Sequence, residues 1–250
     1  MIDRPPVVLI HGVGLDHTMW EGLSPLLSPH QVVSYDMVNH GSALHHVGPC
    51  DLGLFVDQLG GVVASLGGGP VDVVGFSMGA LVAQAFAASH DNLVRRLALL
   101  HAVFDRTPAE RAAVVDRVND VRNGGFASSI ETALERWFSP SFRSGSPAAI
   151  AKVRSVLERN NELAYSYAYE VFATADEQLV STASAISCPT LVMTGAEDPR
   201  STPAMTAKLA SLVANGRSLV LPGLRHMAPV EAPNLVAEHL RAFLGEPDHG

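Results

Sequence analysis

The sequence predicts an α/β domain with a mostly parallel sheet and a helical insertion. Two patterns lead to this prediction: short apolar runs alternate with longer segments of helical period, and the alternation stops over residues 104–187. Such alternation is typical of parallel strands joined by crossover helices. The length of 250 residues and the hydrophobic content of 47% allow one sizeable core. We therefore expect a first core part, 1–103, a helical insertion, 104–187, and a second core part, 188–250.

Six short apolar runs are expected to form the strands, namely 7–10, 31–35, 71–75, 97–100, 190–194 and 218–221. Between the second and third runs, apolar residues recur every three or four positions and form one face of a helix: Leu52, Phe55, Val56, Leu59, Val62, Val63 and Leu66. The run Gly67-Gly68-Gly69-Pro70 ends this helix. Within the insertion, Asn123-Gly124-Gly125 and Ser139-Pro140-Ser141 separate polar helical segments.

The charge and hydropathy patterns limit the partners of this protein. A net charge of −8 and 17 scattered Lys and Arg residues argue against nucleic-acid binding. No segment approaches the roughly 20 apolar residues of a membrane span, and the first residues lack the apolar stretch of a signal peptide. We therefore expect a cytoplasmic protein that acts on a small-molecule substrate, with no membrane partner and with a homodimer left open.

The cysteines and histidines predict no disulfide framework, no metal site and no cofactor. The chain has only two cysteines, Cys50 and Cys188, and Cys188 lies at the start of an apolar strand, where a small buried residue is expected. Among the 11 histidines, the adjacent His45 and His46 lie in a polar loop without a helical partner or a carboxylate cluster. A solvated loop explains that pair better than a set of metal ligands.

A Gly-x-Ser-x-Gly pentapeptide is the most informative feature of the chain. Gly75-Phe76-Ser77-Met78-Gly79 follows an apolar strand and precedes a helical stretch, which is the context of a nucleophile elbow. Such a turn is so tight that glycine is favoured at both ends. Ser77 is then expected at the carboxyl edge of a parallel sheet, although an ordinary strand-to-helix turn has the same spacing.

A reactive serine needs a base, and the base needs an acid. A serine hydroxyl is a weak nucleophile unless an imidazole takes its proton, and His226, in the loop after the last predicted strand, is the candidate. A carboxylate must then hold the imidazole in the correct tautomer, and Asp198 follows the strand 190–194. Glu197 and Asp105 are the rival carboxylates.

The oxyanion formed during acyl transfer requires two N–H donors. The backbone N–H of Met78 lies at the start of the helix after Ser77, where the helix dipole also favours negative charge. We expect the second donor to be the Val13 N–H in the loop His11-Gly12-Val13-Gly14. His11 itself is interpreted as a structural residue of that loop.

Together these segments resemble the α/β-hydrolase family over nearly the whole chain. The matching parts are His11-Gly12-Val13-Gly14 with Trp20, Tyr35-Asp36 with His40-Gly41-Ser42, the turn at Ser77, Cys188-Pro189-Thr190 before Gly195 and Asp198, and His226 before Glu231-Ala232-Pro233. The resemblance implies the α/β-hydrolase fold with a helical cap. Residues 11–20 and 198–203 look most like 3-oxoadipate enol-lactonase-like esterases, and they are also similar to enamide hydrolases and C–C bond hydrolases that act on ring-cleavage products.

Two features depart from the family pattern. The first strand begins only six residues into the chain, so the sheet is expected to lack the usual N-terminal antiparallel hairpin. The segment 36–41 also lacks the arginine and first glycine that commonly precede its His-Gly pair, which puts in doubt any substrate contact inferred from that loop.

The function expected from the sequence is hydrolysis of a small carboxylic ester or lactone through an acyl-enzyme. Hydrolysis of a C–C bond or an enamide is the alternative, and a non-catalytic ligand-binding module is a third reading that no residue favours. The insertion is rich in aromatic residues for a chain that is 6% aromatic, and these either face a common pocket or pack the insertion onto the core. We expect the pocket to be lined by Trp20, Trp137, Phe138 and Phe142.

Overall fold

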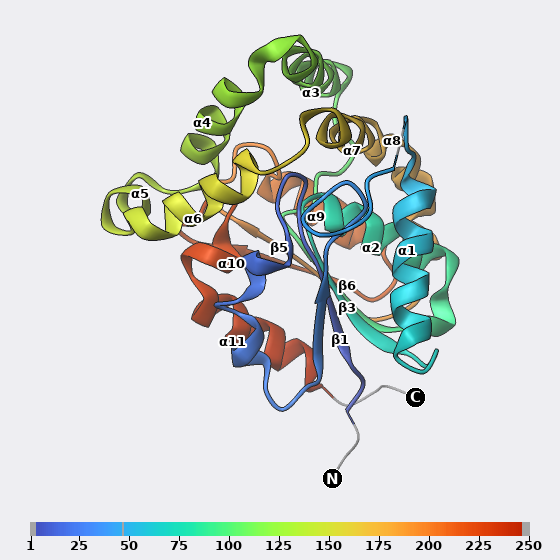
Figure 1. The fold of residues 1–250 in the computed structure, drawn as a ribbon. Helices are drawn as coiled ribbons and strands as arrows, with labels where there is room; N and C mark the ends of the chain where they lie inside the picture. The colour runs from blue at the N-terminus through green and yellow to red at the C-terminus, as the bar shows by residue number, and fades with distance from the viewer. Residues whose placement is uncertain (1–3, 47, 247–250) are drawn as a thin grey trace.

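A six-stranded parallel sheet forms the centre of the molecule in the computed structural model, which describes residues 4–46 and 48–246 (Figure 1). The strand order is β2-β1-β3-β4-β5-β6, and every pair of neighbouring strands is parallel. The strands are β1 (Val7–Ile10), β2 (Val32–Tyr35), β3 (Val71–Phe76), β4 (Val94–Leu100), β5 (Thr190–Gly195) and β6 (Gly216–Leu221). Among the described residues no antiparallel strand precedes β1, as the sequence predicts.

Two strands begin earlier than the apolar runs predict. β4 starts at Val94 because its polar residue Arg96 still pairs with Asp72 of β3, whereas Arg95 lies at a register shift and its side chain forms an ion pair with the same Asp72. β6 starts at Gly216, and three of its six residues are exposed because it lies at the edge of the sheet. Such an edge strand lacks the continuous apolar run of an inner strand.

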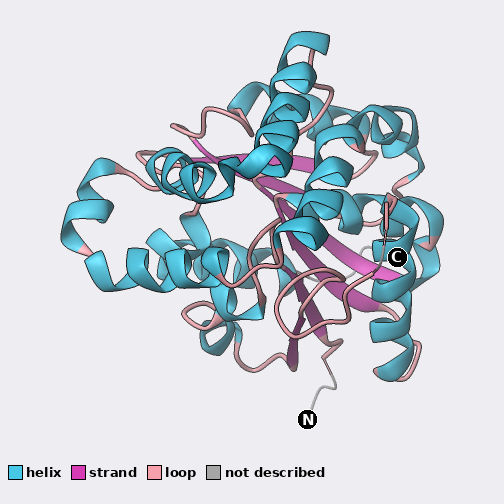
Figure 2. Ribbon diagram, turned by 45° about the horizontal axis from the view of Figure 1, so that its top comes forward, coloured by secondary structure: helices cyan, strands magenta, loops and turns pink. Residues whose placement is uncertain are grey.

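Helices cover both faces of the sheet (Figure 2). α1 and α2 pack against each other on one face, and α11 lies on the other face (Figure 1). The helices outside the insertion are η1 (His17–Trp20), η2 (Ser24–Leu27), α1 (Leu52–Ser65), α2 (Met78–Ser89), η3 (Asp91–Leu93), α9 (Pro203–Leu212), α10 (Ala228–Glu231) and α11 (Pro233–Leu244). None of the described helices is both long and apolar enough to cross a membrane.

A group of helices connects β4 to β5 and lies over the end of the sheet where the strands terminate, which we call the cap (Figure 1). Its helices are α3 (Pro108–Asp120), η4 (Val121–Gly125), α4 (Phe126–Trp137), α5 (Pro140–Gly145), α6 (Pro147–Glu158), α7 (Glu162–Thr174), α8 (Asp176–Thr182) and η5 (Ala183–Ala185). The helical path is interrupted at Asn123 and Gly124, where the backbone leaves helical geometry and Gly124 has a φ of 90°. Ser139 caps α5 through its side chain. Both separators predicted from the sequence therefore mark helix boundaries.

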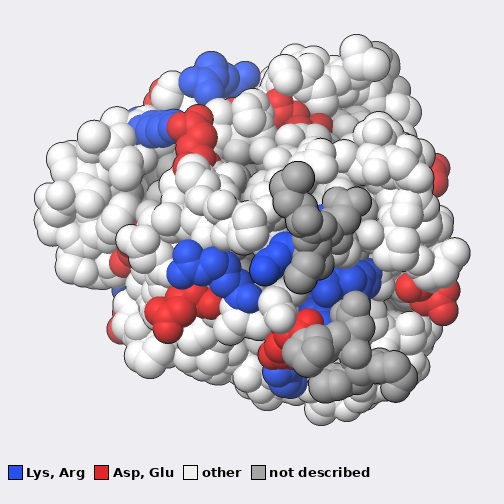
Figure 3. Space-filling view, turned by 90° about the horizontal axis from the view of Figure 1, so that it is seen from below, with Lys and Arg blue, Asp and Glu red and all other residues white. Residues whose placement is uncertain are grey.

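The opposite end of the molecule carries charges of both signs. Seen from below, basic side chains lie beside acidic ones on the described surface (Figure 3). Arg217 at the start of β6 forms an ion pair with Glu246, with a distance of 2.6 Å between Nη2 and Oε2. Cys50 and Cys188 are free thiols, and burial raises the pKa of each to about 11.

Two buried histidines connect the loops after β1 and β2. His11 Nδ1 lies 2.8 Å from the Gly12 carbonyl oxygen, and His11 Nε2 accepts a hydrogen bond from the Met37 N–H at 2.9 Å. The His40 ring lies edge-on to the His11 ring, with 5.0 Å between centroids. His11 is therefore a structural residue of its loop, as the sequence predicts.

These histidines predict a loss of stability in mild acid. Burial lowers the pKa of His11 to about 4 and that of His40 to about 3. Between these values and the ordinary pKa of 6.5, the unfolded chain binds more protons than the folded chain, so the free energy of unfolding falls as the pH falls. We expect a loss of about 2 to 4 kcal/mol between pH 7 and pH 5, measured by urea denaturation.

The variant His40→Asn tests this assignment because its amide can still donate to the Val38 carbonyl, which His40 Nδ1 contacts at 2.9 Å. The variant should lose part of the pH dependence, whereas His45→Gln, in the exposed part of the same loop, should keep all of it. Equal stability of the unmodified protein at pH 7 and pH 5 would contradict the prediction.

Candidate active site

Ser77 lies in a sharp turn between β3 and α2. Its φ of 54° is in the left-handed region, where a residue other than glycine is strained. The flanking glycines are required by close backbone contacts: a Cβ on Gly75 would lie 2.3 Å from the Gly79 carbonyl oxygen, and a Cβ on Gly79 would lie 2.4 Å from the Ile10 carbonyl oxygen. Met78 is the first residue of α2, so its N–H belongs to the amino end of that helix.

His226 and Asp198 come together from the loops after β6 and β5. The distance from His226 Nδ1 to Asp198 Oδ2 is 2.7 Å, and both residues are buried. The other oxygen of Asp198, Oδ1, accepts hydrogen bonds from the backbone N–H groups of Arg200 and Ser201 at 3.0 Å each. Burial opposes ionisation of Asp198, but its interaction with His226 and its side-chain hydrogen bonds outweigh this effect, and its pKa lies well below the ordinary value.

The two rival carboxylates, Glu197 and Asp105, contact other residues. The Glu197 side chain is 54% exposed and faces Arg225 at 3.9 Å, and Asp105 forms an ion pair with Lys208 of α9. Asp198 is therefore the candidate acid that contacts His226.

Ser77 and His226 line the same cavity. Phe76, next to Ser77, packs against the His226 ring with 5.0 Å between ring centroids. No hydrogen bond joins the Ser77 and His226 side chains within the described ranges. Hydrogen bonds of this kind are often long before the substrate binds, so the arrangement fits proton transfer in a complex.

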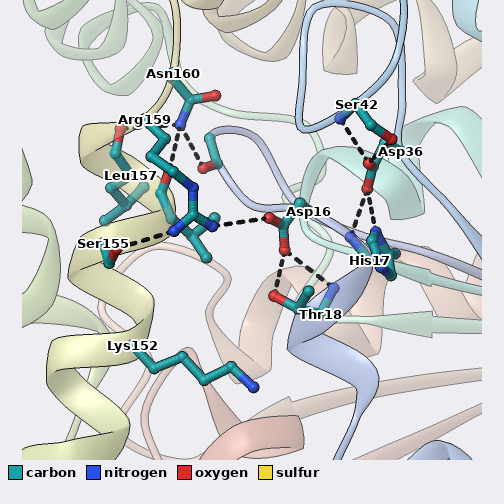
Figure 4. Close-up of polar contacts among 12 residues, drawn as sticks. Asp16, His17, Thr18, Asp36, Ser42, Lys152, Ser155, Leu157, Arg159 and Asn160 are labelled. Carbon is teal, nitrogen blue, oxygen red and sulfur yellow. Dashed lines mark hydrogen bonds and ion pairs between the residues drawn. The ribbon is translucent and has the colours of Figure 1, made fainter.

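The loop after β1 is held from the core side by Asp36. The Asp36 carboxylate accepts hydrogen bonds from the backbone N–H of His17 and from that of Ser42, both at 2.8 Å, and it also contacts the His17 ring and the Ser42 hydroxyl (Figure 4). Asp36 Oδ2 lies so close to Gly41 that a Cβ at this position would collide with it. Asp36 is therefore a structural residue that joins two loops.

The cap contacts the same loop from the other side. Asn160, just after α6, donates a hydrogen bond to the Gly14 carbonyl at 2.8 Å, and Arg159 lies 3.6 Å from Asp16 (Figure 4). Gly14 has a φ of 77°, and a Cβ there would lie 2.9 Å from the Tyr165 ring. The cap therefore packs directly against the backbone next to Val13, which lines the cavity.

The cavity lies between the sheet edge and the cap and has a volume of about 230 Å³. From the core it is lined by Val13, Ser77, Asp198 and His226. From the cap, the aromatic residues that line it are Trp137, Tyr165, Tyr169 and Phe172. A volume of this size admits a small substrate.

The structure differs from the sequence expectation for three of the four pocket aromatics. Trp137 lines the cavity, with its ring 6.0 Å from the His226 ring. Trp20 is instead fully buried beneath Phe76, and Phe138 stacks on Phe142 away from the cavity. Trp20 belongs to η1, which contacts β1 and β2, and the Phe138 and Phe142 rings cover each other, so these three side chains contribute to packing and not to the cavity lining.

Comparison with known proteins shows the family to which this fold belongs. The model of the alpha/beta hydrolase family matches residues 7–239. The chain belongs to this family. It is 37% identical over 240 residues to the (E)-2-((N-methylformamido)methylene)succinate hydrolase of Acinetobacter baylyi, which covers 96% of this chain and 90% of that protein.

Two solved structures extend the comparison. The enol-lactonase from Burkholderia xenovorans LB400 superposes with a TM-score of 0.90 and 28% identity, covering 97% of this alpha/beta hydrolase and 92% of that chain. A thermophilic esterase from Thermogutta terrifontis, with malate bound, has a TM-score of 0.88 and 27% identity, covering 96% and 89%. The predicted fold and the resemblance to enol-lactonases are thus confirmed, and the chain is a hydrolase.

The cavity of this alpha/beta hydrolase is rich in arginine. Arg106, Arg117, Arg136 and Arg200 all line it. Arg106 is paired with Asp176, whereas within the described residues neither Arg117 nor Arg136 forms an ion pair. Burial lowers the pKa of Arg136, and the positive charges of Arg117 and Arg200 lower it further. The carboxylates Glu110 and Asp120 also line the cavity. A guanidinium stays charged, so Arg117 and Arg136 each bring to the cavity a positive charge that forms no ion pair within the described residues.

The sequence analysis missed His101, which follows β4 and contacts Asp198 through its Nδ1 at 2.8 Å. Its position at a strand terminus was the available signal, because the carboxyl ends of parallel strands meet at one edge. His101, Asp198 and His226 place three possible metal-ligand atoms within 4.8 Å of one another. Because Asp198 Oδ2 accepts hydrogen bonds from both Nδ1 atoms, a metal ion bound by Oδ2 and these two atoms would displace both ring protons.

Proposed function

We propose that this protein is a serine hydrolase in which Ser77 attacks a carbonyl carbon. His226 takes the Ser77 proton and passes it to the leaving group, and Asp198 fixes the His226 tautomer and stabilises its positive charge. The N–H groups of Val13 and Met78 hold the oxyanion. Water activated by His226 then hydrolyses the acyl-enzyme.

One observation carries this proposal. The serine of a strained strand-to-helix turn faces a cavity that is also lined by a histidine, and that histidine contacts a buried, ionised carboxylate at 2.7 Å. Nucleophile, base and orienting acid therefore meet at one cavity.

For the substrate, we propose a small carboxylic ester or lactone that carries at least one further carboxylate. The guanidinium groups of Arg117 and Arg136, which line the cavity and form no ion pair within the described residues, support the negative charge. An arginine pairs well with a carboxylate because its planar N–H groups match the two oxygens. The names of the related enol-lactonase and of the malate-bound esterase fit this class.

An enamide is the second candidate, and one observation favours it. The relative with 37% identity is named for a succinate that bears an N-methylformamido-methylene group, which is a dicarboxylate with an acyl–nitrogen bond. The same attack by Ser77 on the acyl carbon would cleave that bond. His226 would then protonate the leaving enamine, either on its nitrogen or on the attached carbon.

Two measurements test the proposal. An organophosphonate should label Ser77, and mass spectrometry should place the adduct on that residue. A panel of neutral esters, carboxylate-bearing esters, enol-lactones and enamides should then show the highest kcat/KM for an anionic member. Labelling at another serine, or no turnover across the panel, would contradict the assignment.

The variant Arg136→Gln should raise the KM for a carboxylate-bearing substrate by about 10- to 100-fold, because a hydrogen bond to a charged group is lost. The KM for a neutral ester should change little. Arg159→Gln is the matched control, since Arg159 lies in the cap but outside this cavity. An equal effect of Arg136→Gln on charged and neutral substrates would rule out a role for Arg136 in binding the charge.

A further inference from the structure

We propose that His101 is a positioning residue for the proposed acid Asp198: it donates a permanent hydrogen bond to the same carboxylate oxygen that His226 uses, and so sets how strongly Asp198 stabilises the charge on His226. This inference rests on the proposed function. His101 transfers no proton. It acts only through Asp198.

Both carboxylate oxygens of Asp198 accept hydrogen bonds from neighbouring groups. Oδ1 accepts from two backbone N–H groups at 3.0 Å, and Oδ2 lies 2.7 Å from His226 Nδ1 and 2.8 Å from His101 Nδ1. An ionised carboxylate only accepts hydrogen bonds, so both Nδ1 atoms must carry the proton. Oδ2 is therefore shared between two imidazole donors.

The surroundings keep His101 neutral. It is fully buried, and its neighbours are the Phe76 ring at 5.6 Å, the His226 ring at 5.3 Å and the Thr194 hydroxyl. Asp198 and His226 are the titratable groups that act on it. Burial lowers its pKa despite the opposing attraction of Asp198. A neutral ring with its proton on Nδ1 donates to Asp198 at any pH near neutrality.

The backbone of His101 is also constrained. Its φ of 52° is in the left-handed region, and its N–H donates to the Met193 carbonyl of β5 at 2.7 Å. Among residues other than glycine, strained conformations of this kind cluster at functional sites. The buried Nε2 atom has no hydrogen-bond partner among the described residues, so Nδ1 is the ring atom that anchors the side chain.

The shared oxygen has a consequence for catalysis. A second donor disperses part of the negative charge of Asp198 and prevents the carboxylate from rotating away from His226. Removing that donor leaves more charge on Oδ2 for a protonated His226 but also leaves the carboxylate less well oriented. The first effect moves the acid limb of the kcat/KM profile to higher pH, and the second lowers its plateau.

Two variants separate the donor from the backbone. His101→Asn keeps an N–H donor close to the position of Nδ1 and tolerates a left-handed φ, whereas His101→Gly relieves the backbone but has no donor. We expect His101→Gly to lower the plateau of kcat/KM by about 10-fold or more and to move the acid limb by about half a pH unit or more. His101→Asn should stay within about threefold of the unmodified protein with its acid limb in place.

The test compares the activities of His101→Asn and His101→Gly. If His101→Asn is no more active than His101→Gly, or if His101→Gly keeps more than a third of the activity, the proposal is wrong. If Ser77→Ala remains active, the proposed reaction itself fails, independently of His101.

A measurement on the unmodified protein tests the proposal even if the His101 variants do not fold. With ¹⁵N-labelled histidine, NMR at neutral pH should show protected ring Nδ1–H protons for the buried His11, His40, His101 and His226, because each of these Nδ1 atoms lies within hydrogen-bond distance of an oxygen acceptor. His226→Gln should remove one of these protons, and His101→Asn should remove another. A His101 ring protonated on Nε2 instead of Nδ1 would overturn the proposal.

Discussion

Replacing Ser77 by alanine is expected to lower kcat/KM by about 10⁴- to 10⁶-fold. The attacking oxygen is lost, and only binding and the oxyanion donors then stabilise the transition state. The fold should persist, because alanine is smaller than serine and the turn depends on Gly75 and Gly79 for its close backbone contacts. Steady-state kinetics on the best substrate of the panel, with circular dichroism on the same samples, measure both effects.

A second serine at the same cavity provides the control. Ser128 of α4 lines the cavity from the cap, and among the described residues its hydroxyl bonds only to the carbonyl of Gly125, which directly precedes α4. Ser128→Ala should therefore change kcat/KM by less than about threefold. If Ser77→Ala kept a tenth of the activity, Ser77 could not be the nucleophile.

Replacing Asp176 by alanine is expected to lower the free energy of unfolding by about 3 to 5 kcal/mol. Asp176, at the start of α8, is fully buried and binds the Arg106 backbone N–H and its guanidinium, both at 2.9 Å. Its removal leaves the buried guanidinium of Arg106 without a counter-charge, although Arg106 keeps its bond to the Phe172 carbonyl. Breaking one partner of such a pair costs more than a surface contact because the remaining charge stays desolvated.

The neighbouring residue makes a matched comparison. Glu177 is 72% exposed and faces Arg111 at 3.7 Å, so Glu177→Ala should cost less than about 1 kcal/mol. Urea denaturation of both variants, followed by circular dichroism, gives the two values. Similar values would show that the buried Arg106–Asp176 pair contributes no more to stability than an exposed pair.

Features made by residues close together in the chain could be predicted from the sequence. The apolar runs located all six strands, with errors of one to three residues at the starts of β2, β4 and β6 and of one residue at the ends of β3 and β5. The turn at Ser77 could be predicted because its glycines are required by local backbone contacts. Asp198 and His226 were readable as candidates because each follows a strand, and parallel strands end at a common edge.

Contacts between segments far apart in the chain were decided only by the tertiary structure. The aromatic residues of the cap could not be assigned to the cavity or to the cap interior, because that depends on how α4 to α7 pack over the sheet. The same packing brings Arg117 of α3 and Arg136 of α4 to one cavity. Periodicity reports which face of a helix is apolar, not which neighbour covers it.

The sequence by itself thus determined the class of fold and the serine turn, since both depend on local backbone preference and on the order of strands. The sequence also favoured Asp198 over Glu197 and Asp105, but only the tertiary structure showed that Asp198 contacts His226 and that His101 contacts Asp198. These contacts depend on distances between loops after β4, β5 and β6, which are set by the pairing of the strands that carry them. The physical reason is that hydrogen bonds act over about 3 Å, and no pattern along the chain specifies a separation that small between distant residues.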